Sequence, residues 1–244
     1  MKASLLPSVK RTILSSTLLL VSFSLLAQTT KVKNLNRFDQ RNFHFGIAIG
    51  TNSAGFALHR KPFNHSIDSL NNVVVNNQAG FNIGIVSSIK IYPYLSLRFI
   101  PTLVLAQRNI DFNFQNKNNE DYTTSRAIES TYFDFPLLLK YRSKRLNNFA
   151  AYFIAGGKFS IDLASNEKVN NLDIPESIIK LKKNTTSAEV GIGTDFFLPY
   201  FKFAIELKMS YTLQNTLIKD NTELSDPLEK ILPKLFFINI SFEG

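Results

Sequence analysis

FKFAIELKMSYTLQ, residues Phe201–Gln214, is the stretch that decides the fold of this chain. Apolar side chains occupy every second position of it, and lysine, glutamate and small polar residues occupy the positions between them. A period of two is the side-chain period of a β-strand, because successive side chains point to opposite faces of a sheet. The stretch therefore predicts a strand with one apolar face and one polar or small face.

Seven further segments repeat this alternation. They are Phe43–Asn52, Ala79–Ile91, a third that starts at Leu95 and reaches Phe114, Glu129–Tyr141, Phe149–Leu163, Ser187–Leu198 and Lys234–Phe242. In the third segment the apolar parity changes between Leu105 and Ile110. We expect a β-bulge near Gln107–Asn109, because one extra residue would restore a single apolar face.

The connections between these segments alternate strictly between long and short. The short ones are 92–94, 142–148 and 199–200, with aromatic residues beside them, and the long ones are 53–78, 115–128, 164–186 and 215–233. Short periplasmic turns, long extracellular loops and aromatic girdles are typical of outer-membrane barrels, whose strands need about 9–11 residues to cross the bilayer. The predicted fold is an all-β, eight-stranded antiparallel transmembrane β-barrel.

A soluble barrel of the lipocalin type also alternates, and it would also be exported. The two classes differ in which face is charged: a soluble barrel is apolar inside, and a membrane barrel is polar or small inside. Here glycines share the non-apolar face with lysine, arginine, aspartate and glutamate, which favours a narrow, ion-paired lumen and a lipid-facing apolar exterior.

The first 27 residues read as a secretory signal. Lys2, Lys10 and Arg11 precede an apolar stretch that ends at Ala27, after which we expect cleavage; an uncleaved anchor is the alternative. Residues 28–41 would then be a periplasmic N-terminal segment, and 42–244 the barrel domain. This places the chain in the cell outer membrane, in contact with outer-membrane lipid.

Composition excludes several classes of function. The chain has no Cys, which removes lipoprotein attachment, disulfides and thiolate chemistry. It carries 28 basic and 19 acidic residues, but the basic residues are scattered along strands and turns, so nucleic-acid binding is not indicated. No pattern for a cofactor or a small-molecule substrate is present.

Ten charged residues lie on the predicted inward face. They are Lys90, Arg98, Asp134, Lys140, Lys158, Glu189, Asp195, Lys202, Glu206 and Lys208. They could neutralise one another in a filled interior or form a regulated polar gate, and both readings require pairing because an unpaired buried charge is costly. Eight strands leave room for side chains and little else, so the barrel is too narrow to conduct a protein.

Two segments are candidate contact surfaces. Arg142, Lys144 and Arg145 form a basic periplasmic turn that could meet lipid phosphates or an acidic partner. The third long connection contains Ile178, Ile179 and Leu181, which could offer an apolar extracellular surface to another protein or could belong to an extended hairpin.

Histidine supplies the only hint of catalysis or metal binding. His44, on the first strand, could belong to the site of a lipid-modifying barrel enzyme if a serine or aspartate of a neighbouring strand lay beside it, although an inward histidine is more often structural. His59, His65 and Asp68 lie in the first long connection and form a weaker candidate for a metal site. We expect no enzymatic activity.

Several short motifs, in order along the chain, resemble one family. They are His44–Gly46, Gly80–Gly84, Leu97–Phe99, Ser130–Tyr132, Pro136–Lys140, Arg145–Asn148, Glu189–Gly193 with Asp195, and Tyr200–Lys202. The sequence resembles the PorT family of the Bacteroidetes type IX secretion and gliding machinery, within a wider outer-membrane-barrel family that shares the Pro-Leu-Leu-Leu-Lys signature.

The resemblance implies a role in exporting cargo that carries a C-terminal signal, with other type IX components as partners. A narrow barrel would serve such a role by contact. Two alternatives remain open: a general small porin-like or adhesion barrel, and the lipid-modifying enzyme.

Overall fold

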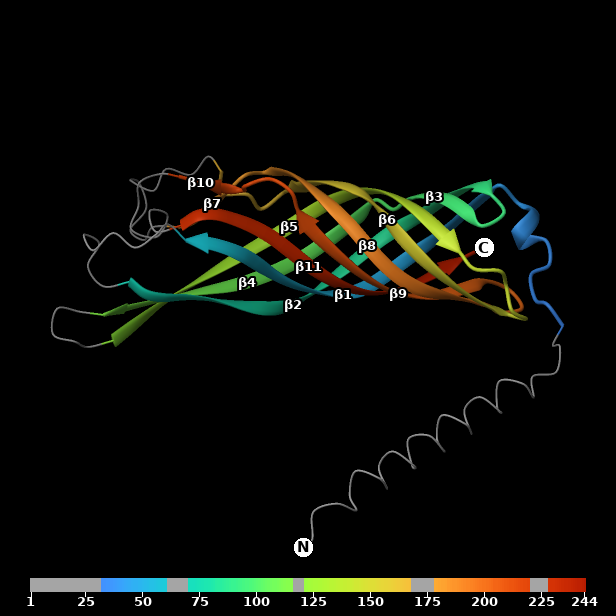
Figure 1. Cartoon of the computed structure of the whole chain (residues 1–244), viewed down its shortest axis with the longest axis horizontal. Coiled ribbons are helices and arrows are strands. Elements are labelled where there is room, and N and C mark those ends of the chain that lie inside the picture. The colour runs from blue at the N-terminus through green and yellow to red at the C-terminus, as the bar shows by residue number, and fades with distance from the viewer. Residues whose placement is uncertain (1–31, 61–69, 116–120, 168–177, 220–227) are drawn as a thin grey trace, which may run out of the picture. The chain divides into compact units, whose positions relative to one another are not determined.

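The alternating segments build one antiparallel β-sheet that closes on itself (Figure 1). In the computed structural model, β1 (Phe43–Arg60) pairs with both β2 (Leu70–Tyr92) and β11 (Leu228–Glu243), which closes the barrel. The order around the wall is β1, β11, β9, β8, β6, β5, then β3 with β4, and β2. Since β3 and β4 share one position between β2 and β5, the nine strands of the sheet fill eight positions. The predicted eight-stranded barrel is confirmed.

The structure describes residues 32–60, 70–115, 121–167, 178–219 and 228–244, and contacts group Asn34–Gly244 into one unit. The predicted signal segment lies outside the described residues. The remaining elements are the 3-10 helix η1 (Phe38–Gln40) and strands β3 (Leu95–Phe99), β4 (Thr102–Gln115), β5 (Asp121–Arg142), β6 (Phe149–Asp162), β7 (Lys180–Leu181), β8 (Asn184–Phe197), β9 (Lys202–Thr212) and β10 (Leu217–Ile218). Among the described residues, no helix is long and apolar enough to span a membrane.

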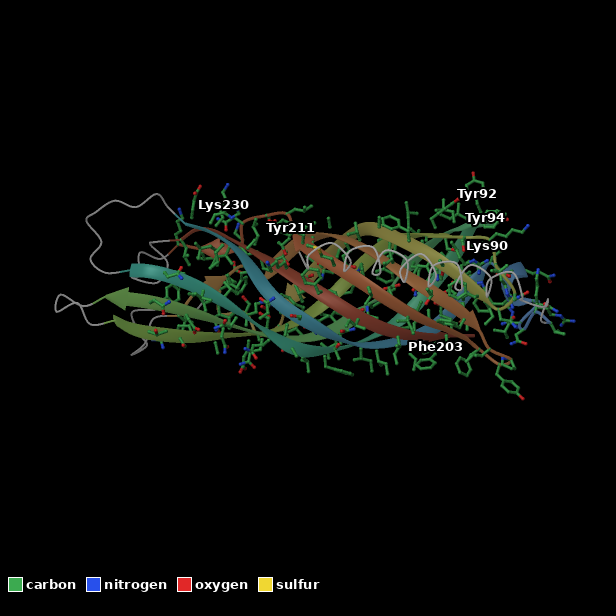
Figure 2. All side chains as sticks on the ribbon, turned by 60° about the horizontal axis from the view of Figure 1, so that its bottom comes forward. Lys90, Tyr92, Tyr94, Phe203, Tyr211 and Lys230 are labelled. Atoms are coloured by element: carbon green, nitrogen blue, oxygen red, sulfur yellow. The ribbon has the colours of Figure 1, made fainter. Side chains whose placement is uncertain are left out.

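The end of the barrel with the short turns is called the periplasmic end below, and the opposite end the extracellular end. Around the periplasmic half, the outward side chains form an apolar belt (Figure 2). On β1, Phe43, Phe45 and Ile47 are each more than half exposed, whereas His44 and Ala48, at alternate positions, are buried. Alternation thus places apolar side chains outside and polar or small ones inside, as predicted from the sequence.

The polarity of the two faces reverses toward the extracellular end. On β4, the outward series runs from exposed Leu105 to Gln107 and Asn109, while the inward series runs through Arg108 to the fully buried Ile110 and Phe112. The strand keeps its register with β5 over its whole length, so no residue is inserted. The expected bulge near Gln107–Asn109 is therefore wrong, because the parity change that suggested it is a change of environment.

A bulge does exist opposite this region, on β2. The register between β2 and β4 shifts between Asn77 and Phe81, and the inward parity of β2 changes there, from Val73 and Val75 to Asn82 and Gly84. A bulge leaves one residue of a strand unpaired and bends it. The bulge on β2 therefore places its apolar residues on the outer face within the belt, and on the inner face on the extracellular side of the belt.

The strands are also longer than predicted. β1 and β2 extend through most of the expected first long connection, and β5 begins at Asp121, inside the expected second one. The asparagine-rich sequence of these stretches suggests loops, but each forms a wall whose outer face meets water. Two short strands, β7 and β10, lie in the remaining long connections and pair with each other, with Leu181 opposite Leu217.

Candidate functional site

The lumen of the barrel is filled by two groups of paired charges, and the larger one lies toward the periplasmic end. Arg98, from β3, donates to Glu206 at 2.8 Å and to Glu243 at 3.2 Å, and Lys202 donates to Glu243 at 2.6 Å. Lys140 donates to both carboxylate oxygens of Asp195 at 2.8 Å. All of these side chains are almost completely buried, so the pairs cross the lumen and join facing walls.

The second group lies next to the first, further along the lumen. Lys158 Nζ is 2.8 Å from Asp134 and 3.3 Å from Glu189, and Lys208 Nζ is 3.0 Å from the other oxygen of Glu189. Both ammonium groups also lie about 5 Å from the centre of the Phe237 ring, at 5.4 and 5.0 Å. A cation near an aromatic face gains electrostatic stabilisation, which is larger when water is excluded.

Arg108 lies on the extracellular side of these two groups, at the boundary with the apolar interior. It is fully buried, and its described partners are neutral: Ser130 Oγ at 3.2 Å and Tyr132 Oη at 3.0 Å. Its guanidinium also lies over the rings of Phe56 and Tyr132, at 4.7 and 5.3 Å. Planar guanidinium suits this position, because it can stack on rings while donating hydrogen bonds from its edge.

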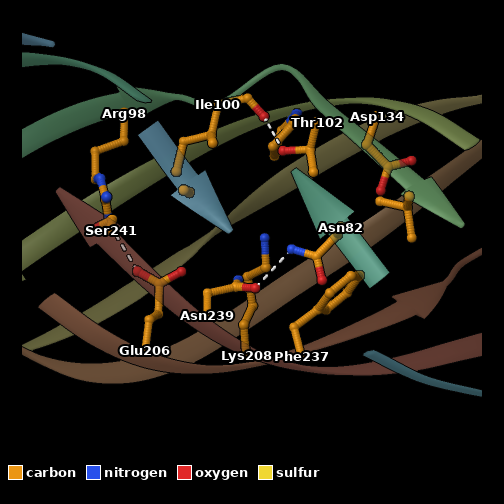
Figure 3. A pocket seen from close by; sticks show the side chains of 13 residues that line it. Asn82, Arg98, Ile100, Thr102, Asp134, Glu206, Lys208, Phe237, Asn239 and Ser241 are labelled. Atoms are coloured by element: carbon orange, nitrogen blue, oxygen red, sulfur yellow. Dashed lines mark hydrogen bonds and ion pairs between the residues drawn. The ribbon is translucent and has the colours of Figure 1, made fainter. Parts of the chain in front are cut away.

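The interior between the charge groups holds a small cavity of about 20 Å³ (Figure 3). Arg98 and Glu206 lie on one side of it, and Asn82, whose side-chain amide donates to Asn239 at 2.8 Å, lies on the other. A second cavity of about 30 Å³ lies at the periplasmic mouth beside His44 and Lys140. Each volume is of the size that one or two water molecules occupy, so neither cavity is a channel or a binding pocket for an organic molecule.

The segment before β1, residues 34–42, closes the periplasmic mouth and is called the plug below. Phe38 of η1 is buried against Ala150 and Phe197, and its ring stacks on that of His44 at 3.8 Å between centroids. Lys90 is half-buried at this mouth and donates to the carbonyl of Asp39 at 2.6 Å. Lys90 is thus the member of the predicted lumen set that pairs with the main chain of the plug, whereas the other nine are buried in the two charge groups.

The predicted basic turn is largely engaged by this plug. Arg142 contacts the Asp39 carboxylate at 2.8 Å and Arg145 contacts it at 3.6 Å, and Arg145 also donates to the carbonyl of Asn34. The Arg145 guanidinium lies 3.8 Å from the centre of the Phe197 ring. Arg142 and Arg145 thus have an acidic partner within the chain itself, while Lys144 is exposed, and contact of this turn with lipid or another protein stays a prediction.

An apolar cluster closes the extracellular end. It contains Phe56, Val73, Ile110, Phe112, Ile179, Leu181, Leu217, Leu228 and Ile231. The expectation that Ile178, Ile179 and Leu181 form an exposed contact surface is wrong for Ile179 and Leu181, which are 5% and 7% exposed, and Ile178 is half-buried. Pairing of β7 with β10 directs these side chains into the interior, where they cap the lumen.

His44 lies beside Ser88, its cross-strand partner on β2, but no hydrogen bond or ion pair joins the imidazole to a serine or a carboxylate among the described residues. Its neighbours are the stacked Phe38 ring and the mouth cavity, which also contacts Ser88, Lys140 and Asp195. Asp195 is already paired with Lys140, and no described carboxylate forms an ion pair with the imidazole. His59 is exposed on β1, and His65 and Asp68 lie outside the described residues; no group of three metal-ligating side chains occurs among those that are described.

Sequence reasoning missed four residues of this interior. Glu243 bridges Arg98 and Lys202, and Tyr152 donates to Glu206 at 2.9 Å. Arg108 and Asp39 are the others. The alternation of β11 and β4 indicates that Glu243 and Arg108 point inward, so those two could have been found, but nothing in the sequence indicates that Asp39 folds back onto the mouth.

The chain matches a known protein family and is similar to several solved structures. Residues 26–217 match the model of the family described as outer membrane protein beta-barrel domain. Similar solved structures include OprG from Pseudomonas aeruginosa, with 14% identity, a TM-score of 0.42 and coverage of 89% of this chain and 99% of that one. Ail of Yersinia pestis, solved with the heparin analogue sucrose octasulfate, has 13% identity, a TM-score of 0.38 and coverage of 84% and 100%.

The outer membrane protein AlkL, determined by solid-state NMR in DMPC bilayers, has 12% identity, a TM-score of 0.43 and coverage of 89% of this chain and 94% of that one. No curated protein sequence matches the chain significantly.

Proposed function

The chain belongs to the outer membrane protein beta-barrel domain family and lies in the outer membrane, and from this premise we propose that it is a non-enzymatic component of the type IX secretion system. In this role it supports the export or assembly of cargo bearing a C-terminal signal through contacts with other components. The ordered motifs that resemble the PorT family support the assignment to this secretion system. The filled interior of the barrel supports action by contact.

The observation that carries the mode of action is the filled lumen. Paired charges cross it, η1 closes one end, and the apolar cluster closes the other. Opening a path would require separating buried ion pairs, and each charge left unpaired costs several kcal/mol, roughly. Transport of a polypeptide through this barrel is therefore unfavourable, so a role in secretion must use surfaces outside the lumen.

Deletion of the gene with complementation by the wild-type protein tests the proposal. We expect the deletion strain to retain signal-bearing cargo in the periplasm and the complemented strain to release it, measured by immunoblotting of culture medium and periplasmic fractions. A matched cargo lacking the C-terminal signal controls for leakage. Normal release of cargo by the deletion strain would reject the type IX role.

A porin-like barrel is the second candidate, and conductance separates it from the first. Purified protein in a planar bilayer is expected to show no steady ionic current, because the cavities between the charge groups and at the periplasmic mouth are only water-sized. A steady open-channel current would favour the porin reading. Loss of host-surface binding together with normal secretion in the deletion strain would instead favour adhesion.

A further inference from the structure

Four lysines form a basic strip on one side of the extracellular wall. They are Lys182, Lys183, Lys230 and Lys234. Lys182 and Lys183 join β7 to β8, and the other two lie on β11. Lys234 is half-buried and the other three are exposed. None of the four forms an ion pair with a described carboxylate.

Strand pairing brings the strip together. The Lys182 N–H donates to the carbonyl of Thr216 at 2.9 Å, and the Thr216 N–H donates to the carbonyl of Ile231 at 3.1 Å. Residues 182, 216 and 231 thus lie side by side on three neighbouring segments. Because neighbouring strands are about 4.8 Å apart, the backbones at Lys182 and Lys230 are separated by roughly 10 Å.

The strip directly continues the lipid-facing belt. Lys234 pairs with Tyr211 across β11 and β9, and the next outward residues of β11 toward the periplasm are Phe236 and Ile238, which are 48% and 58% exposed. In Figure 2, Tyr211 and Lys230 lie near each other toward the extracellular end. Lysines just beyond an apolar belt extend to the level of lipid head groups while their methylene chains cover apolar surface.

The opposite side of the wall lacks such a strip. There β2, β4 and β5 turn asparagines outward, together with Asp111 and Glu129, and the described outward positions of these strands beyond the belt include no lysine or arginine. Acidic residues near the strip are Glu167, whose carboxylate accepts from the Lys183 N–H at 2.7 Å, and the exposed Glu229. Among the described residues the strip therefore carries an excess of positive charge, which the described outward residues of β2, β4 and β5 lack.

We propose that the basic strip binds the phosphate groups of phosphorylated glycolipid in the outer leaflet. Lysine binds phosphate as a compact charge with three donors, and clustered basic residues at a membrane surface attract anionic head groups. The height of the strip favours lipid over an acidic protein, because its side chains lie on the wall beside the belt. Bound lipid would then coat the side formed by β7, β10 and β11, leaving the β2–β4–β5 side for protein contacts.

Native mass spectrometry of the full-length protein in detergent tests this proposal. The probes are lipid A carrying two phosphates and the same lipid A without phosphates. We expect the wild type to retain the phosphorylated form selectively and to release it as salt is raised. The variant Lys182→Gln/Lys183→Gln/Lys230→Gln/Lys234→Gln should bind it at least about tenfold more weakly, since each surface lysine contributes on the order of fivefold.

Matched controls separate this site from general charge. Arg37→Gln/Arg41→Gln/Lys144→Gln removes three exposed basic residues from the other end and should bind as wild type does. Replacing the four strip lysines by arginine should also preserve binding. Folding of each variant is checked by the change in gel mobility that a folded barrel shows on heating. If the fourfold variant does not fold, the double variant Lys182→Gln/Lys230→Gln replaces it.

Three results would overturn the proposal. They are equal binding of the two lipid A forms by wild type, undiminished binding by the glutamine variant, and loss of a cross-linked acidic protein from that variant while its lipid binding stays intact. None of these depends on cargo release, so the outcome is independent of the proposed secretion role.

Discussion

The two halves of the barrel wall use the same strands with opposite polarity. In the periplasmic half, β4 and β11 turn Leu105 and Ile238 outward and keep mostly polar or small residues inside. In the extracellular half, the same strands turn Asn109 and Lys230 outward and bury Phe112 and Ile231. Lipid surrounds the first half and water the second. The difference teaches that alternation defines two faces, while the surroundings decide which face can be apolar.

Removing one charge from the larger group should have the largest effect. Arg98→Leu leaves Glu206 and Glu243 without their shared partner in a buried site. We expect a loss of about 3–5 kcal/mol in the free energy of unfolding, because breaking a buried pair leaves an uncompensated charge. Urea titration of the protein in lipid vesicles, followed by fluorescence or circular dichroism, measures it. Exposed Lys144→Gln is the control, and a loss below about 1 kcal/mol would contradict the prediction.

The extracellular core should respond to lost volume. Phe112→Ala removes a fully buried ring from the apolar cluster and should cost about 3 kcal/mol. The effect should be local, so limited proteolysis from the outside should accelerate while the membrane-embedded half stays protected. Equal protease resistance in wild type and variant would show that this cluster does not seal the extracellular end.

A pair of outward substitutions tests the reversal of polarity directly. Ile85→Arg places charge in the belt, where it faces lipid, and should cost about 2 kcal/mol. Gln107→Arg places the same side chain on the exposed outer face of β4 beyond the belt and should change stability by less than about 0.5 kcal/mol. Similar losses for both, measured by the same urea titration, would mean that the boundary between the halves is misplaced.

A substitution in the plug should change the stability of the barrel least. Asp39→Asn weakens the contacts to Arg142 and Arg145, which are partly exposed pairs contributing at most about 1 kcal/mol. Because the chain has no Cys, Ser88→Cys provides a unique reporter inside the mouth. We expect Asp39→Asn to raise the maleimide labelling rate of that cysteine by about two- to fivefold. The exposed variant Ser143→Cys serves as the reference. Unchanged labelling would show that these contacts do not close the periplasmic mouth.

Much of the candidate site could be predicted because inward parity is visible along single strands. Nine of the ten predicted lumen charges are buried in the two groups, since Lys, Arg, Asp and Glu at alternate positions of an apolar strand can avoid lipid only by facing inward. Their pairing could not be predicted. Arg98 and Glu243 are 145 residues apart in the chain, and only barrel closure between β1 and β11 brings them to 3.2 Å.

The extracellular half was the region where the pattern misled. Asparagine-rich stretches predicted loops, and Ile179 and Leu181 predicted an exposed surface, because a sequence window does not reveal whether water or lipid lies outside the wall. The sequence by itself determined the β-period, the eight wall positions and the charged lumen face, since these follow from local alternation. The tertiary structure decided which face is buried beyond the membrane, which charges meet across the lumen and what closes its ends. Those features depend on long-range contacts between segments that are distant in the chain.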